Sequence, residues 1–126
     1  MCIKRRIYNQ CVIPTMAYGA ETWTTTKQLE QKLLVPQRAM ESRMRNITIR
    51  DKVKNSKIRK QTQVKDIILK IKEAKRRKAG HLMRIADYRW TKRLTEWQPR
   101  YVKRGRGRQK RRWRDDITTY IGKHME

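Results

Sequence analysis

The chain has 126 residues, which suits one domain and leaves little room for two. Hydrophobic residues make up 37% of it and charged residues another 37%, with no phenylalanine, so any core must be thin and built from aliphatic residues with a few Trp and Tyr. It contains no run of ~20 apolar residues, which excludes a membrane-spanning helix.

The charge balance indicates a polyanionic partner. Lys and Arg number 35 against 11 acidic residues, a formal net charge of +24. That much like charge opposes compaction. Nucleic acid is the favoured partner, as RNA, DNA or an RNA–DNA hybrid, because bound phosphates release condensed counterions. The alternative is an ordinary solvated surface, but such surfaces mix both signs of charge. We expect neither a membrane nor a small molecule as partner, and the oligomeric state is left open.

Cysteine and histidine spacing predicts neither a metal site nor a disulfide framework. Cys2 and Cys11 form no CxxC pair, and His81 and His124 lie far from them and from each other. We therefore expect reduced thiols, no metal and no cofactor. The N-terminus shows no signal peptide, so we expect an intracellular protein, and the basic run described below favours the nucleus.

In chain order, Ile3 to Ile13 predict a short helix that Pro14 stops, with Ile3, Ile7 and Cys11 on one stripe. Residues 18–23 predict a turn, because Gly19 can adopt a positive φ at little cost. Thr25 and Gln28 predict a capping box for the next helix.

That next helix is predicted with a proline in the middle of its apolar face. The face comprises Leu29, Leu33, Met40, Met44 and Ile47. Position 36 would complete the stripe, but Pro36 stands there. Proline inside a helix removes a hydrogen bond and costs ~3 kcal/mol. We therefore expect a kinked helix or two helices, with Pro36 as a source of instability or as the start of the second helix.

Two further helices are predicted, one from Asn55 to about Gln61 and a longer one from Asp66 to about Met83. The apolar face of the longer helix comprises Ile67, Ile68, Ile71, Ala74, Ala79 and Leu82. Most of its remaining surface is basic. Lys78 is notable because it borders the apolar stripe.

The C-terminal third combines two short helices with a basic run. Asp87 can cap a helix that carries Trp90, Leu94 and Trp97 on one side and ends at Pro99. Residues 100–112 follow without one acid, and their glycines make them flexible. The last helix places Trp113, Ile117 and Tyr120 on one side, with Gly122 as its stop.

These elements predict an all-α fold: a small irregular bundle of about five helices with a flexible basic Arg/Gly loop before the last one. We divide the chain into a helical region 1–98, a basic linker 99–112 and a C-terminal helix 113–126. The cations expected to bind nucleic acid lie in the basic run and on the long helix: Arg104, Arg106, Arg108, Lys110, Arg111, Arg112, Lys75, Arg76, Arg77 and Lys78. Trp113 could stack on a base, although its helical spacing favours a core position.

Catalytic motifs are absent from the sequence. Asp115 and Asp116 form the one adjacent carboxylate pair, and neighbouring helical side chains diverge too far to hold two metal ions ~4 Å apart. Charges at a helix start that favour the macrodipole explain the pair better. We therefore expect no enzymatic activity from this chain and no catalytic residue.

Several stretches, taken in order, resemble the C-terminal region of the endonuclease–reverse transcriptase of non-LTR retrotransposons. The resemblance covers nearly the whole chain and rests on Tyr18–Trp23, Gln37–Met44, Ala79–His81, Trp90–Arg93 with Glu96–Trp97, and Arg104–Ile117. It implies a thumb and post-thumb segment, which holds the template–primer duplex while the palm performs the chemistry. The palm's catalytic aspartates and the endonuclease domain have no counterpart here, so the resemblance carries over nucleic-acid contact alone.

The sequence departs from the family pattern at several core or cap positions. The family prefers an aromatic at Pro36, a Leu-Gly-like pair at Arg45-Asn46, tryptophans at Arg76 and Lys78, and a proline at Gln109. These changes suggest a decayed genomic copy or a fragment. Three alternatives remain open: a free-standing basic nucleic-acid-binding protein, a marginally folded chain without function and, least favoured, an enzyme in its own right.

Overall fold

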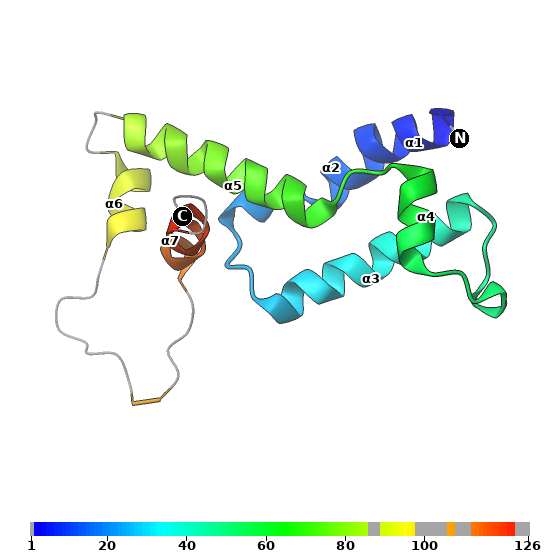
Figure 1. The fold of residues 1–126 in the computed structure, drawn as a ribbon. Coiled ribbons are helices and arrows are strands. Elements are labelled where there is room, and N and C mark those ends of the chain that lie inside the picture. The colour runs from blue at the N-terminus through cyan, green and yellow to red at the C-terminus, as the bar shows by residue number, and fades with distance from the viewer. Residues whose placement is uncertain (1, 86–88, 98–105, 108–111, 123–126) are drawn as a thin grey trace.

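The computed structural model describes residues 2–85, 89–97, 106–107 and 112–122, and these are all-α, without a strand among them. The predicted fold class is confirmed. In chain order the elements are α1 (Cys2–Ile7), the π-helical turn η1 (Tyr8–Val12), α2 (Ile13–Met16), the 3₁₀ turn η2 (Ala20–Thr22), α3 (Lys27–Met44), the 3₁₀ turn η3 (Ile49–Asp51), α4 (Asn55–Thr62), α5 (Ile67–Arg84), α6 (Trp90–Glu96) and α7 (Trp113–Gly122). In Figure 1, α4 lies at one end of the molecule, whereas α6 and α7 lie near the other end of α5.

The N-terminal helix runs through Pro14, so the predicted stop there was wrong. A π-helical turn precedes the proline, in which the Ile13 N–H donates to the Tyr8 carbonyl. Pro14 has no N–H to donate, and the wider π-helical turn before it lets the helix continue past this missing hydrogen bond. The predicted stripe was also wrong, because Ile3, Ile7 and Cys11 are exposed and Tyr8 and Ile13 are buried instead.

The turn after α2 forms as predicted, with Gly19 at φ 66°. The cap of α3 is one residue later than predicted. Thr26, not Thr25, occupies the N-cap, and its side-chain oxygen accepts the Leu29 N–H at 3.3 Å. Thr25 is buried and has a different role, described below.

Helix α3 is one continuous helix of 18 residues with Pro36 inside it. The prediction that position 36 belongs to the core was wrong, because Pro36 is exposed and the adjacent Gln37 is buried. Glu41, one turn further on, is buried as well. The inward face of α3 therefore contains polar residues, which a search for apolar periodicity passes over.

These buried polar groups determine where α5 begins. Gln37 Nε2 donates to the Lys65 carbonyl at 2.9 Å, and its Oε1 accepts the Ile67 N–H at 3.1 Å. Asp66 caps the helix by accepting the Ile68 N–H at 2.8 Å and pairs with Arg59 of α4 at 2.7 Å. The predicted bounds of α4 and α5 agree with the structure to within about a residue. For α5 the reason is the local cap at Asp66, whereas α4 begins after Lys54 without a side-chain cap.

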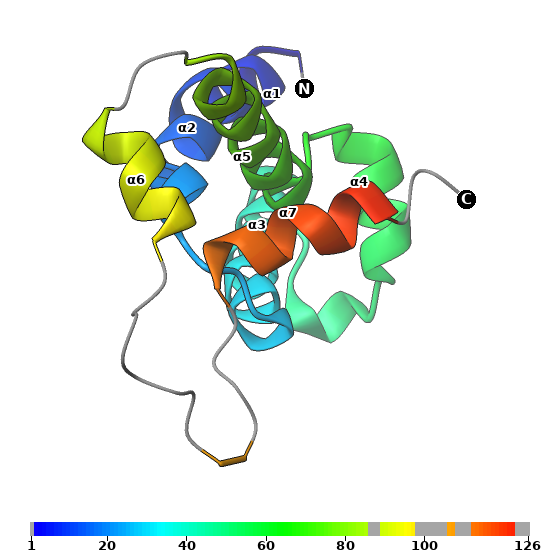
Figure 2. The same ribbon diagram turned by 90° about the vertical axis from the view of Figure 1, so that its left-hand side faces the viewer.

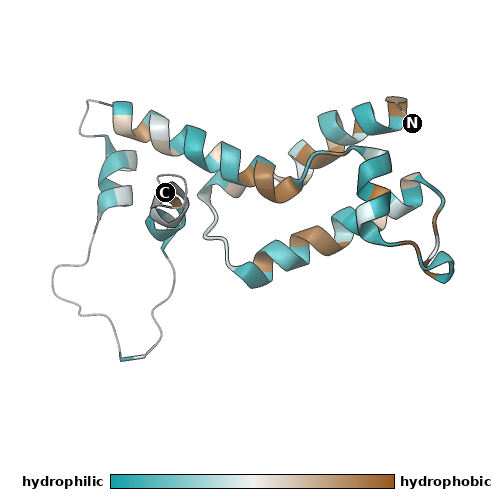
Figure 3. Cartoon of the chain, in the orientation of Figure 1, coloured by the Kyte–Doolittle hydropathy of each residue, from teal (hydrophilic) through white to brown (hydrophobic). Residues whose placement is uncertain are grey.

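The core is small and lies between α5, α3 and the turn after α2. Figure 3 shows hydrophobic colouring along the middle of α3 and the first half of α5. The buried cluster comprises Ala20, Ile67, Ile68 and Ile71, with Met16, Ala17, Leu33 and Leu34 packed against it. Among the described helices, none is both long and apolar enough to cross a membrane.

Candidate nucleic-acid interface

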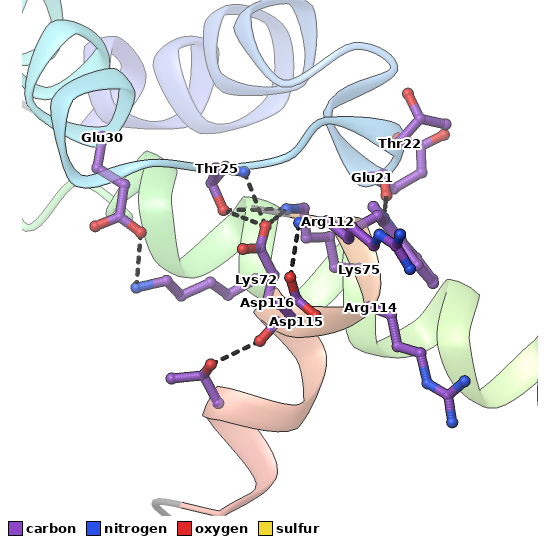
Figure 4. A network of polar contacts seen from close by, with 12 residues as sticks. Glu21, Thr22, Thr25, Glu30, Lys72, Lys75, Arg112, Arg114, Asp115 and Asp116 are labelled. Atoms are coloured by element: carbon purple, nitrogen blue, oxygen red, sulfur yellow. Dashed lines mark hydrogen bonds and ion pairs between the residues drawn. The ribbon is translucent and has the colours of Figure 1, made fainter. Parts of the chain in front are cut away.

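A buried polar cluster fixes α7 against the rest of the molecule. Lys75 Nζ of α5 lies 2.7 Å from Asp116 Oδ2 of α7, and both side chains are about 95% buried. The same carboxylate oxygen accepts the Thr25 N–H at 2.8 Å and the Thr25 hydroxyl at 2.9 Å. Lys75 also donates to Thr25 Oγ1 at 3.0 Å. Figure 4 shows these three residues converging from α5, α7 and the segment before α3, and we call them the Lys75–Asp116–Thr25 clamp.

Hydrogen bonds favour the ionised form of the Asp116 carboxylate. Burial by itself would raise the pKa of Asp116, but the hydrogen bonds from Lys75 and Thr25 outweigh it, so the pKa lies below the usual aspartate value. A second bond supports the same junction, since Trp113 Nε1 donates to the Glu21 carbonyl at 2.6 Å. Trp113 is half-buried and does not belong to the buried core cluster, so the expected core position is not observed. Specific polar contacts therefore hold α7 in place. Figure 2 shows where α7 lies among the other helices.

The structure corrects one predicted phosphate contact. Lys75 is 4% exposed, and its ammonium group is committed to Asp116 and Thr25, so it is not available to solvent phosphates. The other predicted cations of α5 lie outward: Arg76 and Arg77 are exposed and Lys78 is half-buried. Arg77 pairs with Glu73 of its own helix at 3.0 Å.

The basic run is described only in part. Arg106 is exposed beside Gly107, which has φ 109°, and Arg112 is half-buried just before α7. The remaining predicted contacts lie outside the described residues: Arg104, Arg108, Lys110 and Arg111. Asp87 and Pro99 lie outside them too. The predicted cap was nevertheless wrong, because α6 begins at Trp90 with Arg89 at its N-cap and no side-chain cap, and the helix ends at Glu96, three residues before Pro99.

A groove of about 840 Å³ opens where α5, α6 and the start of α7 meet. Lys78 lines it from α5, and Arg112 and Arg114 line it from the start of α7. Within the described part of the chain, these three side chains form no hydrogen bond or ion pair. Arg114 extends away from the clamp in Figure 4. The groove thus gathers cations from separate segments, and Arg114 is one that the sequence did not single out.

Two carboxylates also line the groove, and neither forms a metal site. Asp115 Oδ2 accepts the Arg112 N–H at 2.8 Å, which caps the start of α7. Glu96 is exposed at the end of α6. The expected role of Asp115 as a helix-start charge is confirmed, whereas Asp116 has the buried role described above. No group of three metal-ligating side chains occurs among the residues the structure describes.

Helix α6 presents its apolar stripe to solvent. Trp90, Leu94 and Trp97 are 73%, 70% and 68% exposed. The spacing correctly predicted a helix at Trp90 and Leu94, but the helix ends at Glu96 and Trp97 follows it in an extended conformation. A stripe of this kind usually indicates burial, whereas these three side chains are exposed. Leu94 and Trp97 line the groove, whereas Trp90 does not and instead lies beside Arg93, whose guanidinium carbon is 5.5 Å from the ring centre.

Sequence comparison finds a relative among transposon-derived proteins. The chain is 34% identical over 123 residues to a transposon-derived protein of Caenorhabditis elegans, a match that covers 94% of this chain and 44% of the relative. This similarity supports a transposon-related origin. No protein-family model matches the chain, and no solved structure does.

Proposed function

We propose that this chain is the nucleic-acid-binding, thumb and post-thumb part of a retrotransposon reverse transcriptase. It would contact template–primer phosphates and perform no chemistry itself. The transposon-related origin supports a protein encoded by a mobile element. The motifs from Tyr18–Trp23 to Arg104–Ile117 favour a non-LTR retrotransposon as that element. Because the chain spans less than half of its relative, no activity of a longer protein is assigned to it.

The convergence of Lys78, Arg112 and Arg114 on one groove is the observation that carries the proposal. Arginine forks onto phosphate oxygens in a bidentate manner, and lysine adds a compact charge. These three cations form no ion pair among the described residues and outnumber the two carboxylates of the groove, Asp115 and Glu96, so the groove favours an anionic ligand. The clamp supports this arrangement because it fixes α7, and with it Arg114, relative to Lys78 of α5.

Replacing the groove cations tests the proposal. Lys78, Arg112 and Arg114 are changed together to alanine, and binding to RNA, DNA and hybrid duplexes is titrated at several salt concentrations. We expect weaker binding to all of them, with the salt slope reduced by about one unit per lost contact.

A matched control removes the same number of charges elsewhere. Lys54, Lys57 and Lys60 are exposed at or near α4, at the end of the molecule away from the groove (Figure 1). Their alanine triple variant should lose less affinity and less of the salt slope. Equal losses in the two triple variants would show that net charge alone, and not this groove, drives binding.

A further inference from the structure

Aromatic and apolar side chains line the same groove as the cations. Trp97 stands at the end of α6 with 68% of its surface exposed, and Leu94 lies one turn before it. Trp113 also lines the groove, and its indole N–H is tied to the Glu21 carbonyl, which holds this side of the groove in place. An exposed indole in the same groove as these cations offers a stacking face that phosphate groups alone would not use.

We propose that this groove binds a single-stranded segment of nucleic acid, with one base stacked on Trp97 and the neighbouring phosphates on Arg112, Arg114 and Lys78. This inference rests on the proposed function and narrows its ligand. An unpaired base offers a free π-face to an indole, whereas the bases of an uninterrupted duplex are already stacked on each other. The cations and the indole line the same groove, so one strand can reach both.

A protein segment is the competing occupant, since Leu82 and Leu94 also line the groove. An apolar helix seated there would cover Lys78, Arg112 and Arg114 and remove them from water. Cations buried without a partner cost several kcal/mol each. A strand of nucleic acid brings both an aromatic base and phosphates, so it suits the indole and the three cations, which outnumber the two carboxylates of the groove. An apolar segment suits the apolar side chains alone.

Comparing ligands with and without bases tests the stacking. The complete chain is titrated with a short oligothymidylate, with an abasic oligonucleotide of the same length and with a blunt duplex. We expect oligothymidylate to bind roughly 5- to 150-fold more tightly than the abasic strand, which is the range for one stacked base. The Trp97→Leu variant should lose most of this preference, and Trp97→Phe should retain part of it.

Trp90 provides the internal control. It is the first residue of α6, which Trp97 directly follows, and it is similarly exposed, but it does not line the groove. The Trp90→Leu variant should therefore keep the full preference for oligothymidylate. Circular dichroism of both leucine variants checks that helix content is unchanged, and a Trp97→Leu chain that loses helix content is replaced in the comparison by Trp97→Ala or Trp97→Phe.

The possible outcomes separate the inference from the proposed function. Equal binding of abasic strand and oligothymidylate, with a steep salt dependence, would overturn stacking and leave phosphate binding intact. Equal effects of the Trp90 and Trp97 variants would overturn the assignment to this groove. If neither strand nor duplex binds at low salt, both proposals fail, and the protein-segment occupant becomes the better account of the groove.

Discussion

Lys75 and Asp116 lie 41 residues apart in the sequence and form a buried ion pair of 2.7 Å that joins α5 to α7. The pair stands beside the groove, because Lys78 follows Lys75 by one helical turn and Arg114 precedes Asp116 by two residues. The position of the groove cations thus depends on an ion pair that is itself almost entirely buried.

Removing one partner of this pair should be strongly destabilising. Lys75→Met leaves the Asp116 carboxylate buried without its cation, and we expect a loss of about 3–5 kcal/mol in the free energy of unfolding. Lys75→Met combined with Asp116→Leu removes both charges and should be more stable than the single variant. Chemical denaturation measures both.

The control for this prediction is Lys70→Met, at a lysine of the same helix that pairs with Glu73 at 3.6 Å on the surface. Surface pairs contribute about 0–1 kcal/mol, so this variant should resemble the parent. If Lys75→Met unfolds at the same denaturant concentration as Lys70→Met, the buried pair does not hold α7.

Acid should loosen the same junction. The pKa of Asp116 is lower in the folded chain than in the unfolded one, so its ionised form stabilises the fold above the unfolded value of about 4. This contribution is lost as the pH falls through the folded pKa. The melting temperature should therefore drop below about pH 4, and the drop should be shallower in Asp116→Asn. Parallel curves for the two chains would exclude Asp116 as a source of the acid sensitivity.

Pro36 should destabilise α3 through the backbone and not through a core gap. It is exposed, and without an N–H it cannot donate to the carbonyl of Lys32 one turn earlier. Pro36→Ala should raise the free energy of unfolding by up to ~3 kcal/mol, and Pro36→Phe should gain no more than that. Val35→Ala, at an exposed neighbour, is the control and should change stability little. If the Phe variant is clearly more stable than the Ala variant, position 36 packs in the core after all, as the apolar stripe predicts.

The Arg/Gly run should increase the affinity for nucleic acid without specificity for its base sequence. Alanine at Arg104, Arg106 and Arg108 is expected to weaken binding to all sequences about equally and to lower the salt slope by about one unit per lost contact. Filter binding at several salt concentrations measures this. If the triple variant binds like the parent throughout, the main contacts lie elsewhere, and the groove and the outer cations of α5 become the leading candidates.

Local signals explain how much of the fold the sequence could predict. Helix α5 was predicted almost to the residue, because Asp66 caps it and Ile67, Ile68 and Ile71 mark its inner face. The register of α3 was misjudged because its buried positions are Gln37 and Glu41, which apolar periodicity cannot detect. Their burial depends on partners in distant segments, such as the Lys65 carbonyl and Thr62.

The candidate site was predicted less well, for a related reason. Lys75 was grouped with the solvent cations, although it lies four and eight residues after Ile71 and Ile67 and therefore on the apolar stripe. That spacing was the available signal. Its partner Asp116 is far away in sequence, and nothing local identifies the pair. The exposed stripe of α6 shows the opposite case, in which helical periodicity is correct but the tertiary structure leaves the face open.

The salt dependence of binding by the parent chain tests the central claim most directly. The affinity for a single-stranded oligonucleotide is measured between ~50 and ~200 mM monovalent salt. If the +24 chain engages six or so phosphates, the affinity should fall by ~10³ or more across that range. An affinity that stays flat over the same range would contradict phosphate binding, and with it the assignment of this chain to nucleic acid.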